Sequence, residues 1–134
     1  MTTIGIGLLV IVGLFVALMV GMQLAVQARA RALAGTPVPP LPGTLGARVT
    51  RSTHALVYFF SPMCGACRAL TPRVRALGEK NDAVFAVDVS QEESIAVARA
   101  LRILATPSTV EIADGKIRGM YIGSIPDEVL ARFA

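Results

Sequence analysis

The two cysteines in this 134-residue sequence are separated by two residues, in Cys64-Gly65-Ala66-Cys67. An apolar run at residues 55–60 precedes them and a helix-forming segment follows, so the pattern predicts a strand, a turn and a helix with Cys64 at the helix N-terminus. The unpaired N–H groups and the dipole at that end favour the thiolate, which is the reactive form of cysteine. A second thiol one turn away can close a small disulfide. The pair therefore predicts a dithiol–disulfide redox centre.

No metal site is expected at these cysteines. A structural zinc site needs four ligands, and one C-x-x-C pair supplies two. Soft sulfur ligands select Cu(I), so copper delivery through Met63, Cys64, Cys67 and His54 is an alternative interpretation. His54, the only histidine, stands at the far end of the preceding strand and is more simply interpreted as a surface residue where that strand starts.

The sequence from residue 44 onward predicts one α/β domain. Apolar runs alternate with helical segments in the order β-α-β-α-β-β-α. The expected strands are 54–60, 83–89, 108–113 and 116–122, and the expected helices are 64–80, one that begins at the residues 90–93 and one that begins near 126. Crossover helices between the first three strands predict parallel pairing, and the last two strands are expected to form an antiparallel hairpin at the edge.

Local signals support these elements. Residues 90–93 have the spacing of a capping box, in which side chains bond the free N–H groups of a helix N-terminus. Asp114-Gly115 is a two-residue hairpin signal. Gly119 and Gly123 predict a bulge or a close approach of the backbone around the last strand.

The N-terminal segment predicts a single membrane-spanning helix. Residues 4–26 carry no charge, and about 20 apolar residues span a bilayer. Residues 1–3 lack the Lys or Arg of a signal peptide and the apolar run is too long for one, although Ala28-Arg29-Ala30 leaves cleavage as an alternative. A buried core helix is disfavoured, because nothing else in the chain is large enough to enclose it.

Composition and charge indicate how the chain is divided into segments. Hydrophobic residues make up 54% of it and charged residues 16%, with the apolar excess at the front. From residue 44 onward the sequence has 11 Lys and Arg and 9 Asp and Glu. This small positive excess is not typical of a nucleic-acid-binding domain. We divide the chain into a membrane anchor with a short flank at 1–28, a proline-rich tether at 29–46 that serves as a semi-rigid spacer, and a folded domain at 47–134.

Four features in this order resemble the thioredoxin family over about residues 50–134. The first is the strand–turn–helix around Cys64 and Cys67. The second is Pro72, which must kink or restart the helix at 64–80 and matches the proline that kinks the family's active-site helix. Thr106-Pro107 matches the family's cis-proline before a strand. The final hairpin followed by Gly123 matches the end of the family's sheet. The resemblance implies a thioredoxin fold, with a central mixed sheet flanked by helices, here preceded by one transmembrane helix.

The anchor and tether are similar to those of the membrane-bound thioredoxin-like proteins of bacteria, including TlpA-like proteins, cytochrome-maturation reductants and proteins of the methylamine-utilisation type. The resemblance implies that Cys64 attacks a partner disulfide and that Cys67 resolves the mixed disulfide. It implies a substrate groove formed by Met63, Gly65, Ala66, Thr106 and Pro107, with Pro72 and Gly123 structural. No cofactor other than the Cys64–Cys67 disulfide is implied.

Two positions depart from the family pattern. Met63 stands where thioredoxins carry a tryptophan, and Tyr58 stands where they carry a buried acid that moves the proton of the second thiol. Tyrosine is a poor base at neutral pH, so Cys67 would depend on water or on a partner for its deprotonation. Gly65-Ala66 replaces the usual Gly-Pro, and these two residues tune the reduction potential.

We therefore expect a membrane-anchored thiol:disulfide oxidoreductase whose partners are the bilayer, through residues 4–26, and a protein thiol or disulfide. The alternatives are a non-catalytic accessory subunit of a membrane complex and Cu(I) delivery. We expect the bacterial cytoplasmic membrane, with the domain on the extracytoplasmic side as in the tethered relatives. The positive-inside rule points the other way, because four arginines follow the span: Arg29, Arg31, Arg48 and Arg51.

Overall fold

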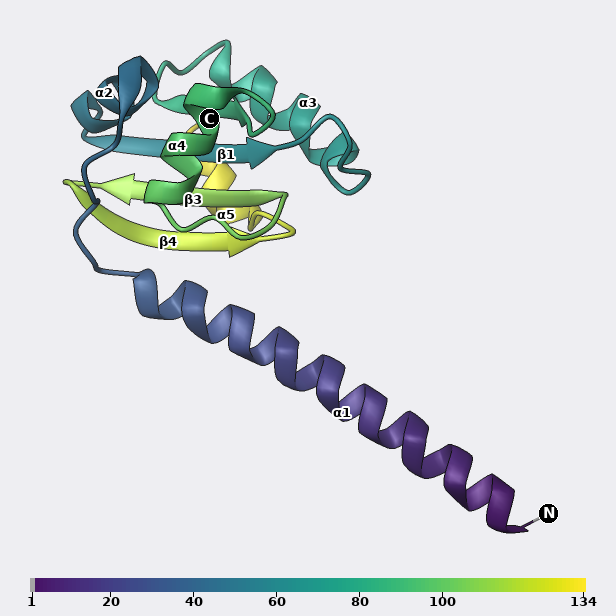
Figure 1. Cartoon of the computed structure of the whole chain (residues 1–134). Coiled ribbons are helices and arrows are strands. Elements are labelled where there is room, and N and C mark those ends of the chain that lie inside the picture. The colour runs from purple at the N-terminus through teal and green to yellow at the C-terminus, as the bar shows by residue number, and fades with distance from the viewer. Residues whose placement is uncertain (1) are drawn as a thin grey trace.

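Strand β1, His54–Phe60, lies at the centre of the fold, and six of its seven residues are buried. In the computed structural model, which describes residues 2–134, β1 belongs to a four-stranded sheet with the order β2-β1-β3-β4 (Figure 1). The other strands are β2, Val84–Asp88; β3, Ser108–Ala113; and β4, Lys116–Ile122. A strand with nearly every residue buried needs cover on both faces of the sheet, which explains the unbroken apolar run before the cysteines.

The pairing of β3 corrects one expectation. β2 runs parallel to β1 as predicted, but β3 runs antiparallel to β1 and the sheet is mixed. The register explains the difference: Asp88 at the end of β2 lies beside Phe60, and Ser108 at the start of β3 lies beside Phe59. The connection between β2 and β3 thus returns to the end of the sheet that it left, and the chain must run back in the opposite direction.

Two pairs of helices cover the sheet. Helices α2, Gly43–Arg51, and α4, Glu92–Ala100, contribute Val49, Val97 and Ala98 to the core on one face. Helices α3, Cys67–Gly78, and α5, Asp127–Ala131, contribute the apolar residues of a second core on the opposite face: Cys67, Val74, Val129 and Leu130. Odd-numbered residues of β1 belong to the first core and even-numbered ones to the second, as the alternation of side chains along a strand requires.

The β3–β4 hairpin forms as predicted. Asp114 and Gly115 have φ of 52° and 73°, which are the left-handed conformations of a two-residue turn between twisted strands. A register shift between Glu111 and Ile112 marks a bulge, so that Gly119 pairs with Glu111. A Cβ on Gly119 would lie 2.6 Å from the hydroxyl of Tyr121. The prediction of a bulge at this glycine is confirmed, whereas the close neighbour is a side chain and not the backbone.

The prediction of a capping box at residues 90–93 is wrong. The N-cap of α4 is Gln91, and no side chain caps it. The Glu93 carboxylate instead accepts hydrogen bonds from Thr44 Oγ1 at 2.7 Å and Leu45 N at 3.0 Å. These two bonds lower the pKa of Glu93. Glu93 therefore caps α2, a helix that the sequence analysis did not predict, although Leu45 and Val49 have helical spacing.

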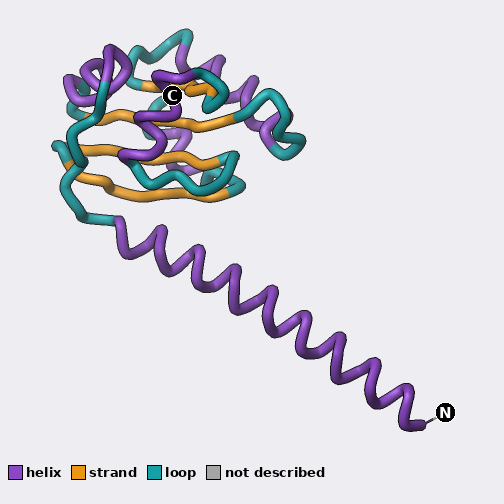
Figure 2. The backbone as a smooth tube through the Cα atoms, viewed as in Figure 1, coloured by secondary structure: helices purple, strands orange, loops and turns teal. Residues whose placement is uncertain are grey.

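Helix α1, Thr2–Leu33, extends away from the domain (Figures 1 and 2). Side chains from residue 3 to residue 25 are exposed, so α1 is not a buried core helix. Within residues 2–134, it is the one helix long and apolar enough to cross a membrane. By length and composition it fits either a membrane span or a signal sequence.

Residues 35–38 of the proline-rich tether dock on the domain rather than standing free as a spacer. Gly35 N donates to Ile117 O at 2.6 Å, Ile117 N donates to Thr36 O at 2.9 Å, and Val38 N donates to Gly115 O at 2.9 Å. The segment thus covers the free edge of β4, where unpaired backbone groups would otherwise face solvent. It also holds the last turns of α1 beside β4. The domain boundaries at residues 28 and 46 stay a prediction.

Candidate redox site

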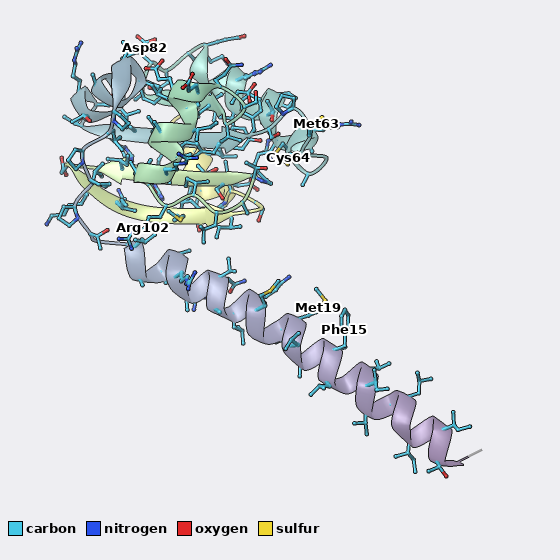
Figure 3. The ribbon with its side chains drawn as sticks, in the orientation of Figure 1. Phe15, Met19, Met63, Cys64, Asp82 and Arg102 are labelled. Atoms are coloured by element: carbon cyan, nitrogen blue, oxygen red, sulfur yellow. A yellow bond between two sulfur atoms is a disulfide. The ribbon has the colours of Figure 1, made fainter. Side chains whose placement is uncertain are left out.

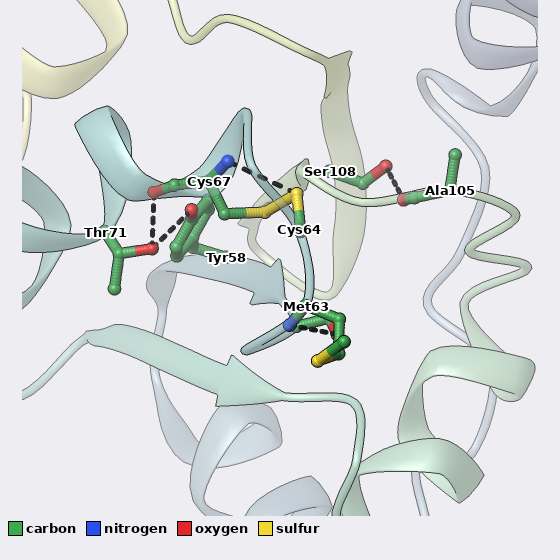
Figure 4. Close-up of a disulfide and its surroundings, with 8 residues drawn as sticks. Tyr58, Met63, Cys64, Cys67, Thr71, Ala105 and Ser108 are labelled. Carbon is green, nitrogen blue, oxygen red and sulfur yellow. Dashed lines mark hydrogen bonds between the residues drawn. A yellow bond between two sulfur atoms is a disulfide. The ribbon is translucent and has the colours of Figure 1, made fainter.

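Cys64 and Cys67 form a disulfide at the end of β1 (Figure 4). The helix α3 begins at Cys67, with Ala66 as its N-cap, so the expectation that Cys64 itself starts the helix is wrong. Cys64 lies in the turn that connects β1 to α3, because the turn uses the residues between Ser61 and Ala66. Cys67 N donates to Cys64 Sγ at 3.2 Å across the helix N-terminus. The favouring of the Cys64 thiolate by this end of the helix stays a prediction.

The two sulfur atoms differ in access. Cys67 is 2% exposed and packs in the core with α5, whereas Cys64 is half-buried. Met63, next to Cys64, is 93% exposed, and Gly65 and Ala66 are exposed too. A partner can reach Cys64 across this surface, while Cys67 is accessible only from within the site.

Thr106 and Pro107 are joined by a cis peptide bond directly before β3. Pro107 is buried, and because Ser108 pairs with Phe59, this segment lies at the same end of the sheet as the disulfide. In the view of Figure 4, Ser108 lies between Cys64 and Ala105, and Ser108 Oγ donates to Ala105 O at 2.6 Å. The structure thus places the expected groove residues, which come from two separate segments of the chain, at the same end of the sheet.

Gly123 and Pro72 lie where the resemblance implied. Gly123 N donates to Pro107 O at 2.9 Å, and Gly123 has φ of 86°, a conformation that favours glycine. Helix α3 runs through Pro72 as one helix, so the proline does not restart it. Arg75, one turn further, lies over the ring of Phe60 at 5.2 Å and places a positive charge near the site.

Tyr58 is fully buried beneath the disulfide (Figure 4). Its hydroxyl lies 2.9 Å from Thr71 Oγ1, and Thr71 Oγ1 donates to Cys67 O at 2.8 Å. Because the single hydroxyl hydrogen of Thr71 goes to Cys67 O, the Tyr58 hydroxyl must be the donor to Thr71. Burial raises the pKa of Tyr58 against the smaller opposing effects of Thr71 and Arg75. Tyr58 is therefore a neutral hydrogen-bond donor that supports the first turn of α3.

Glu111 is a buried carboxylate that the sequence analysis did not single out, and it lies on the same face of the sheet as Tyr58 and Cys67. Glu111 is fully buried and accepts two hydrogen bonds from Arg132, at 3.0 Å and 2.7 Å, and one from Tyr121 at 3.3 Å. Burial acts to raise the pKa of Glu111, but the bonds from Arg132 and His54 outweigh it, and the pKa is lowered. A glutamate within an apolar strand was the signal in the sequence.

His54 takes part in this cluster and not in the redox site. His54 Nε2 lies 2.8 Å from Glu111 Oε1, at the start of β1, while the cysteines follow its other end. The histidine is half-buried, as a residue at a strand start can be. The structure therefore does not bring His54 to Cys64 and Cys67 as the copper interpretation would need. Among residues 2–134, no cluster of three or more His, Cys, Asp or Glu side chains has the spacing of a metal site.

Comparison with known proteins gives consistent matches to the domain. The family model described as Thioredoxin matches residues 44–134. Thioredoxin 1 of Synechococcus elongatus is 32% identical over 60% of this chain and 76% of its own, and Thioredoxin Asp f 28 of Aspergillus fumigatus is 37% identical over 51% and 63%. The crystal structure of reduced Schistosoma mansoni thioredoxin superimposes with a TM-score of 0.54 and 31% identity, over 68% of this chain and 88% of that one.

Proposed function

The chain belongs to the thioredoxin family, and we propose that it is a membrane-anchored thiol:disulfide oxidoreductase that exchanges electrons with a protein partner at the membrane surface. The observation that carries the proposal is the asymmetry of the disulfide. Cys64 is half-buried beside an exposed Met63, and Cys67 is 2% exposed behind it. A more accessible attacking cysteine and a shielded resolving cysteine suit a two-step exchange, in which the partner reaches the first sulfur and the second acts from within the site.

In the reducing direction the reaction begins with the Cys64 thiolate. It attacks one sulfur of the partner disulfide, which forms a mixed disulfide and releases the other partner sulfur as a thiolate. Cys67, once deprotonated, attacks Cys64 Sγ, re-forms the Cys64–Cys67 disulfide and releases the second partner sulfur. Two electrons move to the partner, and the reverse sequence oxidises it. The Cys67 N–H that points at Cys64 Sγ stabilises the first thiolate.

The proton of Cys67 must leave without help from a buried acid. Tyr58 stands at the position where thioredoxins carry the buried acid, but its hydroxyl donates to Thr71 and its pKa is raised. We therefore propose that water or a basic group of the partner takes this proton in the mixed disulfide. This requirement favours a dedicated partner that brings its own base.

Helix α1 supports the membrane part of the proposal. Its exposed apolar side chains need a bilayer to cover them. Met63 and Cys64 lie on the side of the domain toward which α1 extends (Figure 3), so an inserted α1 would turn the disulfide toward the membrane. We propose a single-pass protein of the bacterial cytoplasmic membrane with an extracytoplasmic domain. Alkaline phosphatase fused after Ala134 tests the side, because the fusion is active only outside the cytoplasm.

The decisive experiment isolates the mixed disulfide. Full-length Cys67→Ser protein, purified from its host membranes under non-reducing conditions, is expected to carry a partner on Cys64 that dithiothreitol releases. Mass spectrometry of the released protein identifies the partner and its compartment. The matched control is Cys64→Ser, which keeps only the buried thiol and is expected to trap nothing.

The opposite outcome points to another function. If the wild-type pair stays unreactive toward thiol reagents and glutathione buffers while folded, the oxidoreductase proposal is rejected and the domain is better explained as a docking subunit of a membrane complex. Equal trapping by both single variants would also reject the assignment of Cys64 as the attacking sulfur. Tight stoichiometric Cu(I) binding that either Cys→Ser change abolishes would support copper delivery instead.

A further inference from the structure

An apolar groove lies between the last turns of α1 and the domain, on a face that the redox chemistry does not use. Its volume is about 810 Å³, which is the size of many small-molecule sites in proteins. Apolar side chains from three segments line it: Val26 and Leu33 of α1, Ile103 and Leu104 of the loop before β3, and Met120 and Ile122 of β4. Leu104 is 74% exposed and Ile122 is 39% exposed. Leu104 and Ile122 thus present apolar surface to the groove that the rest of the domain leaves uncovered.

The rim of the groove is positively charged. Arg29 of α1, Arg99 of α4 and Arg102 of the following loop all contribute to it, and the described residues that line the groove include no acidic side chain. Figure 3 shows Arg102 beside the domain end of α1. An apolar slot that three arginines help to line is complementary to a ligand with a long apolar tail and an anionic head.

The groove is also continuous with the membrane span. Val26 is the last residue of the apolar segment at 4–26 and lines the groove, and Arg29, the first charged side chain after it, follows by less than one turn. An α1 that crosses the bilayer places these residues at the boundary between acyl chains and headgroups, where arginines meet anionic lipid.

We propose that this groove binds one anionic phospholipid, with an acyl chain against the apolar lining and the phosphate at Arg29, Arg99 and Arg102. The bound lipid fills the space between α1 and β4 and holds the domain on the membrane surface. The proposal rests on the membrane insertion of α1 and is independent of the redox activity.

Native mass spectrometry of the full-length protein in mild detergent tests this, with phosphatidylglycerol or phosphatidylcholine added. We expect one phosphatidylglycerol per chain and little phosphatidylcholine. The double variant Arg99→Gln/Arg102→Gln is expected to bind phosphatidylglycerol about 25-fold more weakly, because each arginine near an anionic headgroup contributes about a fivefold factor. The charge-matched control Arg51→Gln/Lys80→Gln removes two exposed cations on other elements and is expected to bind normally.

A photoactivatable phosphatidylglycerol with the reactive group in its acyl chain locates the lipid. Cross-links within residues 99–108 and 120–122 support the groove. Cross-links confined to residues 3–25, equal binding of the two lipids, or equal loss in both double variants would overturn the proposal. Disulfide exchange with glutathione is measured on the same preparations, so a chain that exchanges normally but binds no lipid refutes only the lipid site, and one that binds lipid but does not exchange refutes only the redox function.

Discussion

Replacing Glu111 with glutamine is expected to destabilise the domain strongly, although Glu111 lies outside the redox site. The carboxylate is fully buried and is held by four hydrogen bonds from His54, Tyr121 and Arg132. These partners belong to β1, β4 and the residue after α5, so one side chain ties the last helix to the sheet. Glutamine keeps the shape but loses the charge and one acceptor oxygen, which leaves the Arg132 guanidinium without its matched partner.

The magnitude follows from the burial of the pair. Breaking a buried ion pair by removing one partner costs about 3–5 kcal/mol. The Arg132 side chain is 33% exposed and keeps some contact with water, so we expect the lower end, about 3 kcal/mol. For a domain of this size, each kcal/mol lowers Tm by about 4–8 °C, so the expected decrease is about 12–24 °C.

The effect has a defined pH dependence. The pKa of Glu111 in the folded protein is lowered from its ordinary value of 4.5. A lowered folded-state pKa contributes stability that is fully present above the unfolded value and is lost as the pH falls through the folded value. The difference in Tm between wild type and Glu111→Gln is therefore constant near neutral pH and shrinks below about pH 4.5.

Near-ultraviolet circular dichroism of the full-length protein in detergent measures this transition. The only tyrosines are Tyr58 and Tyr121, both in the domain, so α1 does not obscure the signal. Glu128→Gln, the same change at an exposed position in α5, is the control and is expected to leave Tm unchanged. A Glu111→Gln protein as stable as the control at pH 7, or a deficit that persists undiminished at pH 3, would refute the reasoning.

Three further substitutions test other parts of the structure. Tyr58→Phe removes the hydroxyl that donates to the first turn of α3, so we expect the free energy of unfolding, measured in urea, to fall by about 1 kcal/mol. Disulfide exchange is expected to be retained, and its complete loss would show that the hydroxyl has a direct role. Gly46→Ala places a Cβ against the backbone carbonyl of Leu41 and is expected to lower the free energy of unfolding by about 1–3 kcal/mol. The control Gly65→Ala has open space around the new Cβ and is expected to fold normally. Equal stability of the two variants would contradict the packing of α2. Arg102→Gly is expected to raise stability by about 1 kcal/mol, because Arg102 has φ of 55°, and a drop in Tm would count against that conformation.

The features that the sequence analysis predicted depend on local chemistry. The turn around Cys64 and Cys67, the Asp114-Gly115 hairpin and the bulge at Gly119 each need a few neighbouring residues in particular backbone conformations, and those residue types are visible in the sequence. The long uncharged helix is local in the same sense, since each of its hydrogen bonds closes within one turn. The family resemblance added the cis bond before Pro107, which residue spacing alone does not specify.

The features that the sequence analysis did not predict depend on contacts between distant segments of the chain. The direction of β3, the cap that Glu93 provides to a helix 48 residues earlier, and the docking of residues 35–38 on β4 all depend on which segments meet. Such contacts leave no pattern in a short window, because each partner alone resembles an ordinary polar residue or loop. The sequence by itself therefore determined that this protein carries a reactive cysteine pair behind an apolar helix. Only the tertiary structure decided that Cys64 is half-buried and Cys67 is buried, because burial is a property of the packed sheet and helices and not of the C-x-x-C spacing.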